Sequence, residues 1–241
     1  MKKNLNIFKN ITIILPIIDE TNSINKTVSV LLKNNSSEIK KIIFVLHKIK
    51  TKKSSEVICK KYLKKDKKRF KILYQRKRLL GGAMQDAFKI VDTSHCLMMS
   101  SDLETDPYSV KNMIKSSKKN PDKIITASRW LKKNKFKGYG AIKVFANYIF
   151  QNFFSFLYGV KCSDLTFGFR VFPTNVIKKI KWEMLNHSFL FETIIKPIKM
   201  GIKVIEIESS WKKRKEGNTN NVFANYFWYI YIGIKVLLTN N

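Results

Sequence analysis

The sequence predicts an α/β fold with a mainly parallel sheet flanked by helices. Three observations predict it: short β-branched runs recur along the first half, stretches with helical spacing separate them, and polar segments follow the runs. Such alternation implies right-handed crossovers between parallel strands. Ligands of these folds bind beyond the carboxyl ends of the strands, so the polar segments are the places to look for a site.

The expected elements follow one another in regular order. A strand at 11–15 (ITIIL) comes first, and Ile24, Val28 and Leu31 continue with helical spacing. The next predicted elements are a strand at 41–46, a helix at 54–63, a strand at 70–74, a helix at 82–91 and a strand at 95–99. After these we expect a fifth strand at 123–128, an aromatic helix at 141–160, a last strand at 203–208 and a terminal apolar run at 222–238.

The length of 241 residues suits one large domain. We expect that domain over residues 1–217 and an aromatic-rich helical tail over 218–241. The terminal run 222–238 falls short of the roughly 20 apolar residues that span a bilayer, and it contains Asn225 and Lys235. Its aromatic residues cluster in its first half. Two interpretations stay open: a helix at a membrane interface, or a core or dimer helix.

The charge balance is strongly basic, with 47 Lys+Arg against 17 Asp+Glu and a formal net charge of +30. The resulting field attracts polyanions, among which sugar nucleotides and acidic lipid head groups both qualify. Few of the basic residues are Arg, and the Lys excess accompanies abundant Asn and Ile, as an AT-rich coding sequence gives. Because no recognised nucleic-acid motif is present, we expect no nucleic-acid partner and keep a basic nucleic-acid-binding protein as the remotest alternative.

The three cysteines, Cys59, Cys96 and Cys162, lie far apart and lack CxxC spacing. Neither a disulfide framework nor a zinc site is indicated, and a reducing cytoplasm fits this pattern. The N-terminus does not read as a signal peptide, because its apolar stretch is interrupted by Pro16 and ends at acidic residues. We expect a cytoplasmic protein that lies peripherally on the cytoplasmic face of a membrane.

An acidic segment at 100–107 (SSDLETDP) follows the fourth predicted strand. Carboxylates at such a position suit Mg²⁺ or Mn²⁺, which take hard oxygen ligands and share them with phosphates. Asp102 is placed for that role. Asp106 is better explained as a helix N-cap, with Pro107 at the first helical position. Taken alone, the segment is a weak signal for a metal.

An ordered series of motifs makes the signal specific. In chain order they are PIIDE from Pro16, Gln75 followed by LGGA from Leu80, the acidic segment, SRW from Ser128, SDLTFGFR from Ser163 and RKEG from Arg214. From about residue 11 to residue 217, this series resembles the family 2 glycosyltransferases with a GT-A fold. It is most similar to the branch that contains the dolichyl- and polyprenyl-phosphate sugar synthases. The DLTFGFR stretch is the most specific part.

The resemblance implies a nucleotide site near two of these motifs. Pro16, Asp19 and Glu20 match a turn that lies against the nucleotide in the family. Gly81 and Gly82 match a glycine pair at the nucleotide site, where a missing Cβ permits close backbone approach. A tight turn into a helix is the other explanation for the two glycines.

The resemblance also implies contacts with metal and phosphate. Asp102 matches the last carboxylate of the family's Asp-x-Asp motif, which meets the metal and the diphosphate. Arg129 and Arg170 match arginines that meet phosphate groups of donor or acceptor, a task suited to a planar and permanently charged fork. A surface salt bridge is the alternative for both. Arg214 matches the arginine of a late motif that clamps the diphosphate or the acceptor.

The sequence departs from the family's pattern at three points. Ser100 stands where the Asp-x-Asp motif usually has its first carboxylate, and Glu104 is the neighbour that would replace it as a metal ligand. His47 falls in a segment that usually carries an acidic residue for base recognition, and it is either a replacement contact or a solvated side chain. The late motif keeps Arg214 and Gly217 but has Asn220 where the family's pattern ends in a lysine.

These matches imply an inverting glycosyltransferase that uses Mg²⁺ or Mn²⁺ and a nucleotide-sugar donor. A polyprenyl phosphate acceptor is already an anion and needs no general base, whereas a growing cell-surface glycan needs one, for which Asp164 and Glu192 are candidates. Glu192 is equally well explained as a helix-surface charge. Asp102, Asp164 and Arg170 are the predicted catalytic residues. The main alternative is a catalytically silent family member that binds a glycan, a lipid or a protein partner.

Overall fold

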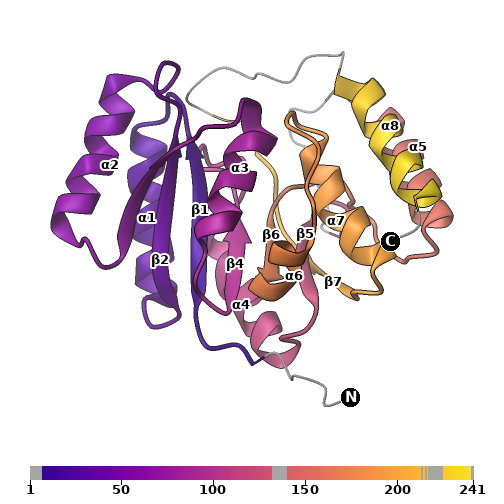
Figure 1. Cartoon of the computed structure of the whole chain (residues 1–241), viewed down its shortest axis with the longest axis horizontal. Helices are drawn as coiled ribbons and strands as arrows, with labels where there is room; N and C mark the ends of the chain where they lie inside the picture. The colour runs from indigo at the N-terminus through magenta and orange to yellow at the C-terminus, as the bar shows by residue number, and fades with distance from the viewer. Residues whose placement is uncertain (1–6, 132–139, 213, 215, 217–224, 240–241) are drawn as a thin grey trace.

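A computed structural model describes residues 7–131, 140–212, 214, 216 and 225–239. Its centre is a seven-stranded sheet with the order β3-β2-β1-β4-β6-β5-β7 (Figure 1). The strands are β1 Ile11–Ile17, β2 Ile39–Leu46, β3 Phe70–Tyr74, β4 His95–Met98, β5 Ile124–Ser128, β6 Arg170–Pro173 and β7 Val204–Glu208. The α-helices are α1 Asn22–Asn35, α2 Lys53–Lys65, α3 Leu79–Ile90, α4 Val110–Lys119, α5 Ala141–Leu157, α6 Thr174–Lys179, α7 Phe189–Lys199 and α8 Asn225–Leu238. A short 3₁₀ helix, η1 Pro107–Ser109, precedes α4.

The predicted α/β fold with a mainly parallel sheet is confirmed. Every neighbouring pair of strands is parallel except the two that involve β6, which runs antiparallel to both β4 and β5. The sequence did not predict β6, because this four-residue strand begins with Arg170 and so lacks a continuous apolar run. Since β6 is antiparallel, the loop that leads into it lies at the same sheet edge as the carboxyl ends of β4 and β5.

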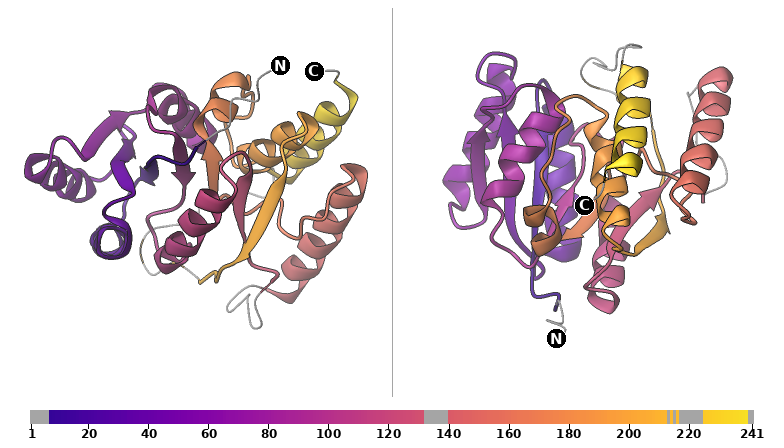
Figure 2. Two further views of the ribbon diagram at one scale, coloured as in Figure 1. Left: turned by 90° about the horizontal axis from the view of Figure 1, so that it is seen from below. Right: turned by 45° about the vertical axis from the view of Figure 1, so that its right-hand side comes forward.

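Helices cover both faces of the sheet (Figures 1 and 2). One face packs against α1, α2 and α4, and the other against α3, α5, α6, α7 and α8. Strands that are covered on both faces lose their alternation of polar and apolar residues. This explains why β1 is buried along almost its whole length and why it was recognisable as an apolar run.

The C-terminal helix α8 packs onto the rest of the protein through aromatic side chains. Tyr229 stacks on Phe191 of α7, with ring centroids 6.1 Å apart, and the Tyr158 hydroxyl donates to the Gly233 carbonyl oxygen at 2.8 Å. A Cβ at Gly233 would lie 2.3 Å from Phe154, so α8 approaches α5 closely there. The expected boundary between the domain and its tail lies outside the described residues. Within the ranges that the structure describes, no helix is long and apolar enough to span a bilayer.

Candidate active site

The candidate site lies at the sheet edge where β1, β4 and β5 end. The acidic loop, residues 99–106, follows β4 at this edge, and the turn at 18–21 follows β1, its parallel neighbour. Ser101 joins the two segments, because its hydroxyl donates to the Pro16 carbonyl oxygen at 2.9 Å. The residues that the sequence predicted in these two segments therefore lie together.

A left-handed backbone at Leu103, with φ 65°, shapes the acidic loop. Such a conformation costs a non-glycine residue roughly 1–2 kcal/mol. Just after this bend, the Glu104 N–H donates to Asp102 Oδ1 at 2.9 Å. Both carboxylates face one cation: Arg214 Nη2 donates to Asp102 Oδ2 and Arg214 Nε donates to Glu104 Oε1, each at 2.9 Å. Asp102 is almost fully buried in this arrangement.

The donor set around Asp102 shows whether a divalent ion fits here. Two carboxylates that converge on one positive charge suit Mg²⁺ or Mn²⁺, which combine few protein carboxylates with water and substrate phosphates. Ser100 does not join them, since its hydroxyl shares a hydrogen bond with Thr105 at 3.0 Å. Among the described residues, no group of three His, Cys, Asp or Glu side chains could hold a metal ion. Asp102 and Glu104 therefore fit an ion shared with a bound phosphate, rather than one held by protein ligands alone.

Glu20 determines the shape of the turn after β1. Its buried carboxylate accepts the backbone N–H groups of Ile18 at 2.7 Å and of Asp19 at 3.1 Å. Burial raises the pKa of Glu20 and the nearby charge of Asp102 adds to this rise, whereas the backbone hydrogen bonds oppose it. Asp19 keeps a partly exposed position at the same edge. The turn thus places one buried and one accessible carboxylate beside the acidic loop.

His47 occupies the loop after β2, where a contact with the nucleotide base was one interpretation. Its Nδ1 accepts the backbone N–H groups of Ile49 and Lys50, both at 3.1 Å. In addition, its backbone N–H donates to the Thr51 hydroxyl at 2.8 Å. The described contacts of His47 therefore shape its own loop.

Gly81 and Gly82 lie in the first turn of α3, where neighbouring backbone leaves no room for a side chain. A Cβ at Gly81 would lie 2.4 Å from the Met184 carbonyl oxygen, and one at Gly82 would lie 2.7 Å from Lys77 Cβ. The Gly81 N–H donates to the Leu185 carbonyl oxygen at 2.6 Å. In the structure, these glycines permit close approach of the chain's own backbone.

Gly81→Ala is expected to lower the free energy of unfolding by about 1–3 kcal/mol, the usual cost of overpacking. The added methyl group would collide with the Met184 carbonyl, which is backbone and cannot rotate away. Urea unfolding followed by circular dichroism measures the change. Gly140→Ala is the matched control, because a Cβ there has nothing within 4 Å. Equal stability of the two variants would contradict this explanation.

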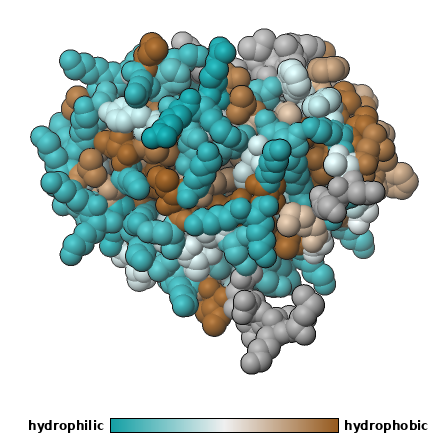
Figure 3. All heavy atoms as spheres, viewed as in Figure 1, coloured by the Kyte–Doolittle hydropathy of each residue, from teal (hydrophilic) through white to brown (hydrophobic). Residues whose placement is uncertain are grey.

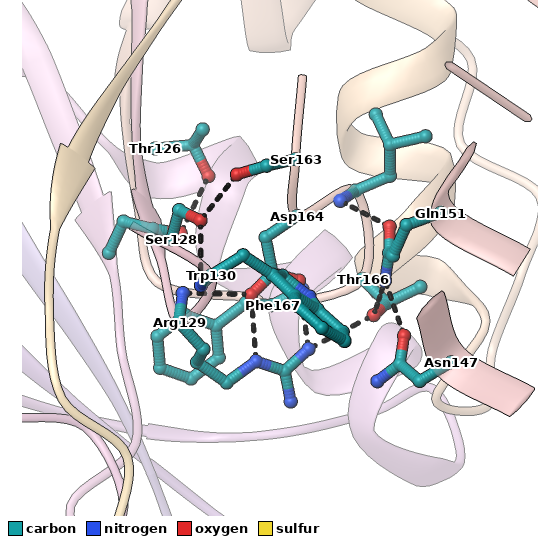
Figure 4. A network of polar contacts seen from close by, with 12 residues as sticks. Thr126, Ser128, Arg129, Trp130, Asn147, Gln151, Ser163, Asp164, Thr166 and Phe167 are labelled. Atoms are coloured by element: carbon teal, nitrogen blue, oxygen red, sulfur yellow. Dashed lines mark hydrogen bonds and ion pairs between the residues drawn. The ribbon is translucent and has the colours of Figure 1, made fainter. Parts of the chain in front are cut away.

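Arg129 and Asp164 form a buried ion pair beside the end of β5 (Figure 4). Arg129 Nε and Nη2 donate to the two Asp164 carboxylate oxygens at 2.7 and 2.8 Å, a short and directional geometry. The backbone N–H groups of Arg129 and Phe167 add hydrogen bonds at 3.1 and 3.2 Å. Asp164 has no exposed surface. The structure therefore brings these two predicted residues together as partners, and the alternative of a surface salt bridge is wrong for Arg129.

Further polar contacts fix the loop before β6 from three sides. The Ser163 hydroxyl shares a hydrogen bond with Ser128 of β5 at 2.7 Å, and the Ser163 N–H donates to Glu206 of β7 at 2.8 Å. From α5, Gln151 accepts the Leu165 N–H at 2.7 Å. Because two strands and a helix all contact this loop, the Arg129–Asp164 pair lies in a rigid environment.

Arg170 is fully buried in β6, and internal groups surround its guanidinium. It donates to the Thr126 hydroxyl at 3.0 Å, to the Leu165 carbonyl oxygen at 2.7 Å, to the Thr193 hydroxyl at 2.7 Å and to the Leu190 carbonyl oxygen. Burial lowers the pKa of Arg170 to about 10. The guanidinium joins the loop before β6 to α7 and exposes no atom for the predicted phosphate contact. A surface salt bridge is also wrong for this residue.

Glu192 is fully buried in α7, so its interpretation as a helix-surface charge is wrong. Its carboxylate accepts the backbone N–H groups of Glu183 at 2.8 Å and of Met184 at 2.9 Å, and it pairs with Lys196 at 2.6 Å. Burial raises the pKa of Glu192, although Lys196 and the backbone hydrogen bonds oppose this. Glu192 therefore holds the backbone against which Gly81 packs.

Two residues at the edge were not singled out from the sequence. The Glu216 carboxylate accepts the Thr21 N–H at 2.9 Å and the Ser23 hydroxyl at 2.8 Å, at the start of α1. Burial opposes ionisation, but these and other hydrogen bonds outweigh it and lower the pKa of Glu216 to about 2. His187 lies near Arg214, and burial followed by that charge lowers the pKa of its imidazole. No local pattern signals either role, because the partners are distant in sequence.

Comparisons with known proteins give a family match and several similar folds. A family model described as Glycosyl transferase family 2 matches residues 12–181. One similar structure is glucosyl-3-phosphoglycerate synthase from Mycobacterium tuberculosis with Mn²⁺, UDP and glucosyl-3-phosphoglycerate, at TM-score 0.70 and 9% identity over 97% of this chain and 81% of that chain. The same enzyme with Mn²⁺, UDP-glucose and phosphoglyceric acid gives a TM-score of 0.69 at 9% identity, over 97% and 81% of the two chains. At such low identity, the likeness shows the shared fold alone. A sequence comparison with curated proteins found no match.

Proposed function

The chain belongs to glycosyl transferase family 2, and on that premise we propose that it moves a sugar from a nucleoside diphosphate donor to an acceptor, with inversion at the anomeric carbon. Its sheet and flanking helices form the GT-A fold predicted from the sequence. The observation that carries the proposal is the convergence of Asp102 and Glu104 on one positive charge at the end of β4.

In this proposal, Asp102 and Glu104 hold Mg²⁺ or Mn²⁺, which supplies positive charge to the leaving diphosphate. The chain's own residues supply the other contacts with the donor. Pro16 and the turn closed by Glu20 form the wall beside the acidic loop, and Arg214 offers a planar fork suited to phosphate oxygens. The proposal is consistent with the structurally similar synthase, which has been crystallised with Mn²⁺ and UDP-glucose.

The contacts of Asp164 and Glu192 favour an acceptor that carries its own negative charge. A sugar hydroxyl needs a general base within reach of the attacking oxygen, and these were the two candidates. Arg129 and backbone N–H groups occupy the oxygens of Asp164, while backbone N–H groups and Lys196 occupy those of Glu192. A phosphate acceptor avoids this difficulty. We therefore place polyprenyl phosphate, as in the dolichyl- and polyprenyl-phosphate branch, before a growing glycan.

A membrane surface is the proposed location of the acceptor. Helices α5 and α8 carry an exposed apolar face, whose most exposed members are Ile142, Phe145 and Phe156 of α5 and Phe227, Ile230 and Leu238 of α8. Figure 3 shows apolar residues gathered at the side of the molecule where these helices lie. An anionic lipid surface complements this face in apolarity, and it attracts the protein as a whole, whose net charge is +30. We propose peripheral binding on the cytoplasmic side of the membrane, because free cysteines such as Cys59 are typical of a reducing compartment.

A transfer assay tests the proposed activity. Purified protein is incubated with membrane lipids, Mn²⁺ and labelled UDP- and GDP-sugars, and the lipid fraction is analysed for label. Transfer that EDTA abolishes would support the proposal. Metal-dependent donor binding by calorimetry without transfer to any lipid, glycan or phosphorylated acceptor would favour a catalytically silent binding protein instead.

Flotation with lipid vesicles tests the membrane surface. We expect the protein to float with phosphatidylglycerol vesicles and to remain behind with phosphatidylcholine. Phe156→Glu combined with Phe227→Glu should lower the bound fraction by about tenfold or more, since each buried aromatic ring contributes about 1.5–3 kcal/mol. Ile49→Glu is the control, because Ile49 is 89% exposed but lies on the loop after β2. A dimer in solution that the double variant dissociates would assign the face to a second copy of the chain.

A further inference from the structure

After β7, the chain runs back across the edge that holds the candidate site. We call this stretch the crossing segment, and its described members are Trp211, Lys212, Arg214 and Glu216. Trp211 forms an isolated antiparallel bridge with Thr105, and the Lys212 N–H donates to the Glu104 carbonyl oxygen at 3.4 Å. The crossing segment therefore contacts the acidic loop through its backbone as well as through Arg214.

Two opposite charges of the crossing segment hold the two sides of the site. Arg214 bridges Asp102 and Glu104 of the acidic loop. The Glu216 carboxylate accepts the first backbone N–H groups at the start of α1, those of Thr21, Asn22 and Ser23, at 2.9, 3.2 and 3.2 Å. A carboxylate is favoured there because a helix amino end carries partial positive charge. Each charge of the segment thus faces a complementary partner.

Resting on the metal-dependent transfer proposed above, we infer that Arg214 competes with the divalent cation for Asp102 and Glu104, and that Glu216 determines how firmly Arg214 is held. An ion that the same oxygens coordinate at about 2.0–2.1 Å would lie close to the guanidinium that donates to them at 2.9 Å, and the two positive charges would repel each other. Binding of the ion therefore favours the departure of Arg214. Glu216 resists this movement, because it fastens the same segment to α1.

The competition has a consequence for metal affinity. Removing the guanidinium takes away the positive charge that Asp102 and Glu104 share in the described part of the chain. A cation then enters without competing with Arg214, and it relieves the repulsion between the two carboxylates. Metal affinity should therefore rise when Arg214 is removed, which is the opposite of what an arginine that assists ion binding would give.

Direct measurement of Mn²⁺ binding tests the inference without any activity. The full chain is treated with EDTA and dialysed, and free Mn²⁺ is followed by electron paramagnetic resonance during titration. We expect Arg214→Gln to lower the Kd for Mn²⁺ by at least about tenfold relative to the unmodified protein. Glu216→Gln, which keeps Arg214 but weakens its tie to α1, should lower the Kd by a smaller factor. It also provides a second variant if Arg214→Gln does not fold, as judged by circular dichroism.

Arg69→Gln is the matched control for the loss of one positive charge. Arg69 pairs with Asp66 at 3.8 Å just before β3, at the opposite edge of the sheet. The Kd of this variant should equal that of the unmodified protein. An equal gain in affinity in Arg69→Gln and Arg214→Gln would overturn the inference, because net charge alone would then explain it.

Other results would decide between the competition at Asp102 and Glu104 and the proposed sugar transfer. Unchanged or weaker binding by Arg214→Gln would overturn the competition, while sugar transfer by the unmodified protein would still uphold the proposed function. If neither protein bound Mn²⁺, the competition would be overturned as well. Transfer in the presence of EDTA would then show an enzyme that needs no metal, and a lack of transfer under all conditions would remove the proposed function itself.

Discussion

Asp102→Asn is expected to reduce the rate of sugar transfer by about 100-fold or more, since metal assistance contributes several kcal/mol and each 1.36 kcal/mol is tenfold in rate. The substitution keeps the size of the side chain, and its amide oxygen can still accept the Glu104 N–H. It removes the negative charge that faces the cation position at the end of β4. Initial rates of label transfer at saturating donor measure the effect.

Asp106→Asn is the matched control in the same loop. Asp106 caps η1 by accepting the Tyr108 N–H at 3.1 Å, and an asparagine performs the same task. We therefore expect its transfer rate to stay close to that of the unmodified protein. If Asp102→Asn kept full activity, the assignment of the metal site to Asp102 would be wrong, whatever the acceptor.

Asp164→Asn is expected to lower the free energy of unfolding by about 3–5 kcal/mol, the usual cost of breaking a buried ion pair by removing one partner. The Arg129 guanidinium would keep its charge while losing the carboxylate that accepts from Nε and Nη2. One of the two Asp164 oxygens would also become an NH2 group, so either the backbone N–H of Arg129 or that of Phe167 would lose its acceptor. Urea unfolding at neutral pH measures the change.

Glu38→Gln is the control for this second experiment. Glu38 pairs with Lys118 at 2.6 Å, but the Lys118 side chain is 49% exposed, and surface pairs of this kind contribute about 0–1 kcal/mol. A cost below about 1 kcal/mol in both variants would show that solvent or other groups replace the lost charge beside Arg129. Transfer activity of refolded Asp164→Asn would then separate a role in stability from a role in binding.

Much of the fold was predictable because its strands lie in a doubly covered parallel sheet. The runs at β1 and β2 contain little polar interruption, and each is followed by a helix with apolar residues at helical spacing. Strand β6 is the exception. Its first residue is a buried arginine whose partners come from β5, α7 and the preceding loop. The partners in β5 and α7 are distant in sequence, so no local pattern predicts the strand.

The candidate site was predictable as a location but not as a set of contacts. Asp102 was found from its position after β4, and the structure places it beside the turn after β1. Asp164 was predicted as catalytic from its motif alone, whereas its partner Arg129 lies 35 positions earlier in the chain. Glu216 was missed for the same reason, since it contacts α1 from the other end of the sequence. Contacts across such separations depend on the folded sheet.

The strand order has a further consequence for the timing of folding. Strands β1 to β4 can pair with one another as soon as they are synthesised, whereas β5 needs β6 and then β7, which come later in the chain. Arg214 follows β7, so the ribosome releases it after the acidic loop has been made. During that interval, Asp102 and Glu104 have no guanidinium between them. During synthesis, a cation in solution can therefore reach these carboxylates before Arg214 does.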